Sequence, residues 1–124
     1  MLGGDKMYVE PGMIVTAPYH DIFTDEEALG IFLVVHVDKN NAICLKITSK
    51  THDDYDYYVN LPEGCCKLVT NSNVCVNKIY TLHIANLKHI MDRLPNQYMV
   101  EVLTTWNKVT QNIFCDILKV IGGV

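Results

Sequence analysis

The chain has 124 residues, of which 49% are hydrophobic and 19% are charged. This length and composition predict one compact domain with a real core and exclude an intrinsically disordered protein. The formal net charge is −4 and Arg93 is the only arginine, so the chain lacks the basic character that is typical of strong, non-specific nucleic-acid binders. We assign residues 1–10 to an N-terminal tail and residues 11–124 to a single domain.

The lack of a recognisable targeting signal and the cysteine usage bear on the cellular compartment that we expect. No apolar run approaches the roughly 20 residues that cross a bilayer, and the N-terminus lacks a basic region followed by an apolar core. The count of five cysteines is odd, and Cys44 and Cys115 lie within apolar patterns. We therefore expect a cytoplasmic protein with reduced, buried thiols and no membrane partner.

Two groups of side chains could suggest a metal. Cys65 and Cys66 are adjacent, but no Cys-x-x-Cys pair or matching histidine pair accompanies them. Asp53, Asp54 and Asp56 include carboxylates two residues apart, but the further ligands and the glycine of a calcium loop are absent. The sequence predicts neither a metal site nor a cofactor.

The first half of the chain predicts three strands and one long polar connection. The strands are expected at residues 13–17, 30–38 and 42–47, where β-branched and apolar residues stand between turn signals. The strand at 30–38 is nearly all apolar, so both of its faces should be covered. The acidic segment 19–29 is long for a hairpin connection, and two interpretations stay open: a functional loop, or a solvated loop with one helical turn.

The second half predicts shorter strands followed by helices. Strands are expected at residues 57–61, 67–69, 74–76 and 78–84. Residues 86–94 carry apolar side chains at helical spacing and end at Pro95, and steps of three and four continue along a long amphipathic helix at 96–120. This order predicts an α+β protein that is mainly β: a strongly bent antiparallel, SH3-like barrel with the long C-terminal helix packed on it.

Five segments stand in an order and spacing that resemble a known family. They are Pro-Gly-Met-Ile-Val at 11–15, Asp-Glu-Glu-Ala-Leu-Gly at 25–30, Ile-Thr-Ser at 47–49, Tyr-Asp-Tyr-Tyr-Val at 55–59 and the stretch from Ser72 to Leu82. The family is that of the PemK/MazF toxins, and the similarity runs from about Pro11 to Leu118. Its better-known members are small SH3-like barrels that cut RNA. The resemblance implies a metal-independent endoribonuclease of single-stranded RNA, a homodimer, and an antitoxin peptide that lies in the groove of the toxin.

The resemblance also implies which residues carry the chemistry. The 2′-hydroxyl of the substrate attacks the adjacent phosphorus, which requires a base, an acid and cationic groups around the phosphorane. Thr48 matches the functional hydroxyl of the family and Ser49 follows it, so both are candidate catalytic residues. The family also uses an arginine of an Arg-Pro pair at the start of the second strand. Gly30, Ile31 and Phe32 stand there instead.

Other side chains could fill the roles that the missing arginine leaves. Lys46 or Lys50 could act as point charges, although without bidentate geometry. His20 or His52 could titrate as acid or base near neutral pH. The binding residues that we expect are Lys46, Lys50, His52, Tyr55, Tyr57 and Glu26.

Two further interpretations stay open. The missing arginine, the acidic balance and the many tyrosines favour a barrel that has lost cleavage and binds a protein partner, as a regulator or a host-directed inhibitor from a mobile element. A third interpretation is non-catalytic RNA binding, with Tyr55, Tyr57 and Tyr58 stacked on single-stranded bases.

Overall fold

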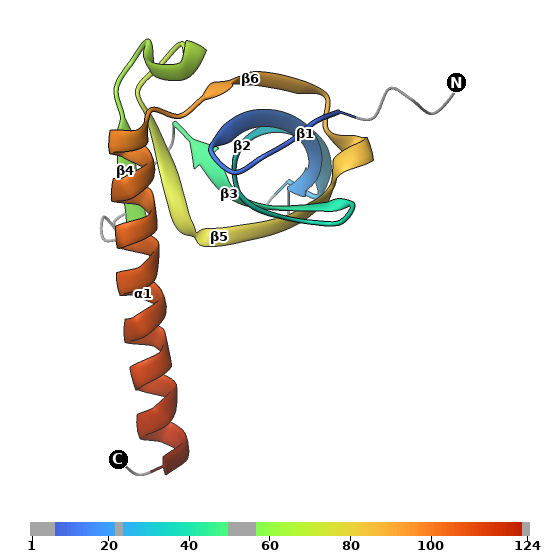
Figure 1. Ribbon diagram of the computed structural model, residues 1–124. Helices are drawn as coiled ribbons and strands as arrows, with labels where there is room; N and C mark the ends of the chain where they lie inside the picture. The colour runs from blue at the N-terminus through green and yellow to red at the C-terminus, as the bar shows by residue number, and fades with distance from the viewer. Residues whose placement is uncertain (1–6, 22–23, 50–56, 123–124) are drawn as a thin grey trace.

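The computed structural model describes residues 7–21, 24–49 and 57–122 and contains a curled antiparallel sheet with one long helix (Figure 1). The strands are β1 (Met13–Asp21), β2 (Glu26–Asp38), β3 (Asn41–Thr48), β4 (Tyr58–Leu61), β5 (Ser72–His83) and β6 (His89–Arg93). Two 3₁₀ helices, η2 (Cys65–Lys67) and η3 (Ile84–Asn86), precede the helix α1 (Asn96–Gly122). The sheet has the order β4-β5-β3-β2-β1-β6 and forms a half-barrel, which confirms the predicted fold.

Strand β2 is buried on both of its faces, as its apolar sequence predicts. Phe32, Leu33 and Val34 are all 0% exposed. Because side chains alternate along a strand, Leu33 packs into one apolar cluster whereas Phe32 and Val34 pack into another. The helix-side cluster includes Ile14, Leu33, Leu45, Leu94 and Val102. The Phe32 cluster includes Val15, Ala17, Phe32, Val34 and Cys44.

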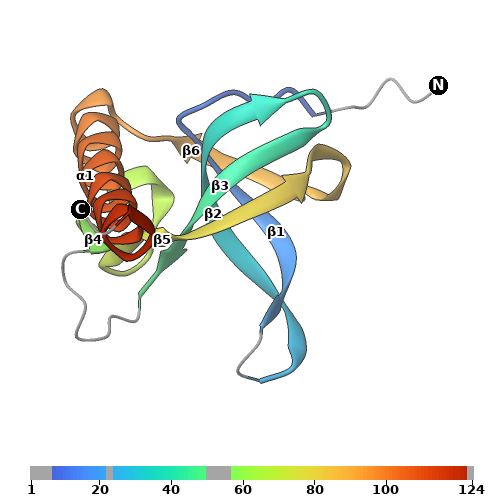
Figure 2. The ribbon, with the colours of Figure 1, turned by 90° about the horizontal axis from the view of Figure 1, so that it is seen from below.

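Helix α1 covers the sheet with only its first half. Val102 and Val109 are buried in the helix-side cluster, and Trp106 packs against that cluster half-buried. The orthogonal view shows α1 beside β4 and β5 at one side of the curled sheet (Figure 2). From residue 110 to residue 122 every residue is exposed, and Ile121 is 77% exposed. The predicted helix and its apolar stripe are confirmed, but the second half of the stripe extends beyond the sheet (Figure 1).

The prediction of a helix at residues 86–94 is wrong. Most of this segment forms strand β6, which pairs antiparallel with β1. The Lys88 N–H donates to the Thr16 carbonyl at 2.8 Å, and the Leu94 N–H donates to the Gly12 carbonyl at 2.8 Å. A helix of this length is marginal in water, whereas the edge of β1 offers backbone partners at once.

The segment 19–29, interpreted from the sequence as a loop, is mostly strand. Strand β1 continues to Asp21 and β2 begins at Glu26, so the two form a long hairpin. Pro18 lies inside β1, where the sequence predicted that the strand would already have ended. It is tolerated because β6 pairs only with residues 13–16 of β1, which leaves β1 a single neighbour at Pro18.

Two further strand predictions are corrected in the segment after β4. Residues 67–69 do not form a strand: Cys66 and Lys67 have left-handed φ values of 58° and 64°, so the backbone turns there instead of extending. The strands predicted at 74–76 and 78–84 are one strand, β5.

The thiols differ in exposure. Cys44 is buried, as predicted, and burial raises the pKa of its thiol to about 12. Cys115 is exposed, so the prediction that it is buried is wrong, because it lies on the part of α1 that extends beyond the sheet. In the ranges that the structure describes, no helix is both long enough and apolar enough to span a membrane.

Candidate functional site

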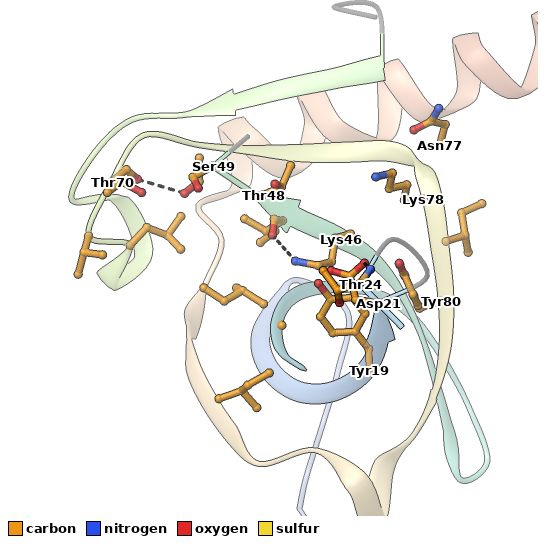
Figure 3. Close-up of a pocket in the computed structure, with 18 residues that line it drawn as sticks. Tyr19, Asp21, Thr24, Lys46, Thr48, Ser49, Thr70, Asn77, Lys78 and Tyr80 are labelled. Atoms are coloured by element: carbon orange, nitrogen blue, oxygen red, sulfur yellow. Dashed lines mark hydrogen bonds between the residues drawn. The ribbon is translucent and has the colours of Figure 1, made fainter. Parts of the chain in front are cut away.

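A groove of about 790 Å³ lies between the β1–β2 hairpin, the end of β3, the segment before β5, and β5 (Figure 3). Its polar and aromatic lining consists of Tyr19, Asp21, Thr24, Lys46, Thr48, Ser49, Thr70, Ser72, Asn77, Lys78 and Tyr80. Ile31, Ile47 and Leu68 add apolar contacts from the helix-side cluster. The groove therefore combines cations, hydroxyls and aromatic rings on one surface.

Lys46 is a groove cation that contacts both a carbonyl oxygen and two aromatic rings. Its Nζ donates to the Ile47 carbonyl at 2.9 Å and lies 5.5 Å from the ring centroid of Phe32. The same nitrogen lies 5.1 Å from the ring centroid of Tyr19 (Figure 3). Burial lowers the pKa of Lys46, and the nearby charge of Lys78 lowers it further, whereas Asp21 acts in the opposite direction. The lysine is thus a partly desolvated ammonium held against two aromatic rings.

Three aromatic rings form a cluster beside the Lys46 ammonium. Tyr19, Phe32 and Tyr80 contact one another edge to face, with centroids 5.2 to 5.9 Å apart. Tyr19 reaches this place because Gly30 has no side chain: a Cβ at residue 30 would lie 2.8 Å from Tyr19 Cε1. Burial raises the pKa of the Tyr19 and Tyr80 phenols, and Asp21 and, for Tyr80, also Tyr19 raise it further. Both phenols therefore stay neutral hydrogen-bond donors at physiological pH.

Lys78 lines the groove at a bulge in β5. Leu45 is opposite Ile79, whereas the next residue, Lys46, is opposite Cys75. Residues 76–78 of β5 are consequently unmatched, and bulges of this kind re-aim side chains. The bulge places Lys78 in the same groove as Lys46, from a different strand.

The sequence match decides the family. Residues 10–110 match the family described as "PemK-like, MazF-like toxin of type II toxin-antitoxin system". The chain belongs to this family. The match includes every residue of the groove and ends within α1, before the exposed second half of the helix. No curated protein sequence matches the chain significantly.

Solved structures of low sequence identity share the PemK/MazF fold. An endoribonuclease in complex with its cognate antitoxin from a mycobacterial species has a TM-score of 0.67 at 12% identity, over 84% of this chain and 96% of that chain. Toxin MazF-mt6 of Mycobacterium tuberculosis has a TM-score of 0.66 at 12% identity, over 80% and 96%. MazE–MazF from Deinococcus radiodurans gives 0.67 at 16% identity, over 85% and 98%. At these identities the likeness shows the fold alone.

The site residues expected from the sequence fall into three groups in this PemK/MazF family member. Lys46, Thr48 and Ser49 line the groove together. Tyr57 is half-buried against the helix-side cluster, and Glu26 is exposed opposite Asp21 at the hairpin end; neither lines the groove. Lys50, His52 and Tyr55, with Asp53, Asp54 and Asp56, lie outside the described residues.

Sequence reasoning missed several groove residues. Tyr19 and Asp21 fell in a segment interpreted as a loop, although they belong to β1. Lys78 and Tyr80 are two positions apart in one strand, a spacing that places both on the same face. That signal was available within the predicted strand at 78–84, but nothing in the local sequence shows that this face lies beside Lys46.

No other arginine takes the place in the groove of the Arg-Pro arginine that this chain lacks. Arg93 pairs with Glu10 and donates to the Pro11 carbonyl at 3.4 Å, and it does not line the groove. Gly30 and Phe32 are buried. The described part of the groove therefore takes its positive charge from lysines. Within the described ranges no three His, Cys, Asp or Glu side chains gather closely enough to hold a metal ion.

Proposed function

We propose that this family member is a metal-independent endoribonuclease of single-stranded RNA and that the groove binds the scissile phosphodiester. The observation that carries the proposal is the convergence of Lys46, Lys78 and Thr48 on one groove. Two cations in a partly desolvated groove attract a phosphate more strongly than exposed lysines would. Family membership supports the same reaction, and one neighbour of the same fold is described as an endoribonuclease.

The groove contains groups suited to each part of this reaction. The 2′-oxygen attacks phosphorus, the bond from phosphorus to the 5′-oxygen breaks, and the products carry a 2′,3′-cyclic phosphate and a 5′-hydroxyl. Negative charge develops on the non-bridging oxygens, where Lys46 and Lys78 can neutralise it and Thr48 can donate a hydrogen bond. The protonated phenols of Tyr19 and Tyr80 provide two further donors.

Two lysines differ from one arginine in the geometry with which they bind a phosphate. An arginine presents a planar fork that binds two oxygens at once, whereas each lysine is a compact point charge. Lys46 and Lys78 come from neighbouring strands, so together they can contact two oxygens of one phosphodiester. In this proposal the pair replaces the single arginine of the family.

We further propose that the protein is neutralised by an antitoxin peptide, forms a homodimer and is cytoplasmic. The family belongs to type II toxin–antitoxin systems, and two neighbours of the same fold are described as complexes with an antitoxin or with MazE. The groove rim exposes apolar side chains that suit a peptide: Leu29 at 63%, Val69 at 85% and Ile79 at 52%. Acidic residues of such a peptide would complement the groove lysines.

The test is cleavage of a long single-stranded RNA with many sequence contexts, with and without EDTA. Wild-type protein should give the same cuts in both conditions, with 2′,3′-cyclic phosphate ends. Lys46→Ala or Thr48→Ala should lower the rate by about 10²- to 10³-fold, because each removes a group that contacts the developing charge. Lys88→Ala is the matched control, since Lys88 is exposed and does not line the groove, and its rate should equal that of wild type.

Two results would contradict the proposal. RNA left intact at a high excess of folded protein would favour the non-catalytic interpretation, in which the same groove binds a protein partner. Cuts that persist in Thr48→Ala and Lys46→Ala but vanish with EDTA would indicate a contaminating metal-dependent nuclease.

A further inference from the structure

Lys46 is held against the groove wall by contacts on more than one side. Its position on β3 places it directly before Ile47 and Thr48, at the strand end that forms the groove wall. The rings of Tyr19 and Phe32 lie against its ammonium, and the Ile47 carbonyl accepts one of its three hydrogens. The remaining hydrogens can be donated to an oxygen bound in the groove.

A charge clamp alone does not require this environment. An exposed, hydrated ammonium is sufficient to attract a phosphate, and partial burial makes the charged form of a lysine less stable. The same burial, together with the neighbouring charge of Lys78, lowers the pKa of Lys46 and so makes it a stronger acid than an ordinary lysine. The surroundings therefore suit a group that gives up its proton.

We propose that Lys46 is the general acid of the cleavage reaction and protonates the departing 5′-oxygen. This inference rests on the proposed function and assigns a distinct role within it, because neutralising the phosphorane requires only a charge whereas protonating the leaving group requires a transferable proton. Lys46 is then a catalytic residue and Lys78 supplies charge without transferring a proton.

The step balances with groups that line the groove. The 2′-oxygen forms a bond to phosphorus as its proton passes to the Asp21 carboxylate, the one carboxylate among the described groove residues. The bond from phosphorus to the 5′-oxygen breaks with its electron pair on oxygen, and that oxygen takes a proton from Lys46 Nζ. Lys46 is left as a neutral amine and Asp21 as a carboxylic acid, and proton exchange with water restores both.

The titratable groups that surround Lys46 define the expected pH dependence. Tyr19 and Asp21 act on it from β1, and Cys75 and Lys78 act on it from β5; Tyr80, also on β5, contacts the Tyr19 ring. Because cleavage requires protonated Lys46, the rate should fall as the pH rises through the pKa of Lys46, which lies below the ordinary lysine value of 10.5. Burial raises the pKa of the Tyr19 and Tyr80 phenols, so both stay protonated at neutral pH.

The decisive experiment replaces the bridging 5′-oxygen of one linkage by sulfur. A thiolate leaves without protonation, since the pKa of a thiol is only about 8.5, so a sulfur-linked substrate does not require a general acid. Full-length wild type, Lys46→Ala and Lys46→Arg are compared on matched oxygen-linked and sulfur-linked oligonucleotides. Lys78→Ala is the matched control, because it removes a groove cation without removing the proposed proton donor.

We expect Lys46→Ala to lose about 10²- to 10⁴-fold in rate on the oxygen-linked substrate. Its loss on the sulfur-linked substrate should be smaller by about tenfold or more, because that substrate needs the charge of Lys46 but not its proton. Lys46→Arg keeps the positive charge, but a guanidinium holds its proton too tightly to donate it. This variant should cleave the oxygen-linked substrate poorly, without the decline in rate at alkaline pH, and should regain activity on the sulfur-linked substrate. Lys78→Ala should lose the same factor on both substrates. An equal loss by Lys46→Ala on both substrates would overturn the general-acid role and leave the proposed nuclease intact. Wild type inactive on both substrates would overturn the nuclease itself.

Discussion

The two apolar clusters on either side of β2 differ in what covers their outer edge. The helix-side cluster is closed by α1, and its fully buried members, such as Leu33 and Val102, are aliphatic. The Phe32 cluster continues outward into the rings of Tyr19 and Tyr80, which border the groove, and Lys46 lies against Tyr19 and Phe32. In strand β2, Leu33 thus packs into a core that is closed by the helix, whereas the preceding residue, Phe32, packs against the cation Lys46.

This difference separates stability from the proposed chemistry. An aliphatic core closed by a helix stabilises the fold by removing apolar surface from water. A partly buried ammonium contributes little to folding, because its desolvation opposes the contacts that it makes. Substitutions in the helix-side cluster should therefore change stability more than cleavage, and substitutions at the groove should do the reverse.

The largest effect on stability is expected from Leu33→Ala. Leu33 is 0% exposed in the helix-side cluster, and truncation leaves a cavity that the sheet and α1 cannot fill. The free energy of unfolding should fall by about 2–5 kcal/mol, measured by urea denaturation, while the cleavage rate per folded molecule stays near that of wild type. A stable variant with impaired cleavage would show that the two clusters do not divide the roles in this way.

An intermediate effect is expected from Gly30→Ala, which acts where the clusters meet the groove. The new Cβ would lie 2.8 Å from Tyr19 Cε1, so Tyr19 has to move away from Lys46. We expect a loss of about 1–3 kcal/mol in unfolding free energy together with a marked loss of cleavage. Tyr19→Ala is the partner variant: if the collision is the cause, the double variant loses less stability than the sum of the two single variants.

The smallest effect is expected at the end of α1. Ile121 is apolar and 77% exposed, so Ile121→Ser should change the unfolding free energy by no more than about 0.5 kcal/mol. Val102→Ala, on the buried part of the same helix, is the matched comparison and should be clearly destabilising. Equal losses in the two variants would mean that the exposed half of the helix is packed in solution.

Sequence reasoning succeeded where local pattern determines structure. The buried strand β2, its partner β3 and the helix α1 follow from apolar runs and helical periodicity. Thr48 and Ser49, named from the family resemblance, and Lys46, named in place of the missing arginine, line one groove, and their roles stay predictions. Sequence reasoning failed where a distant partner decides the outcome. Segment 86–94 became a strand because β1 offered an edge for it to pair with.

The site was harder to predict than the fold for the same reason. Lys78 meets Lys46 only because β5 carries a bulge opposite β3, and neighbouring residues do not encode that register. Tyr19 reaches Lys46 only because residue 30, on another strand, is a glycine. Such pairings depend on contacts between strands, which a reading of local patterns does not contain.

The contact between Tyr19 and Gly30 also restricts which single substitutions residue 30 can accept. An arginine placed directly at residue 30 would bring its own Cβ into the Tyr19 ring, and the displaced ring would no longer lie against Lys46. An arginine could therefore be accommodated at residue 30 only after residue 19 had become smaller, so the order of the two substitutions matters. As long as the Tyr19 ring lies against Lys46, it thus excludes a larger side chain at residue 30.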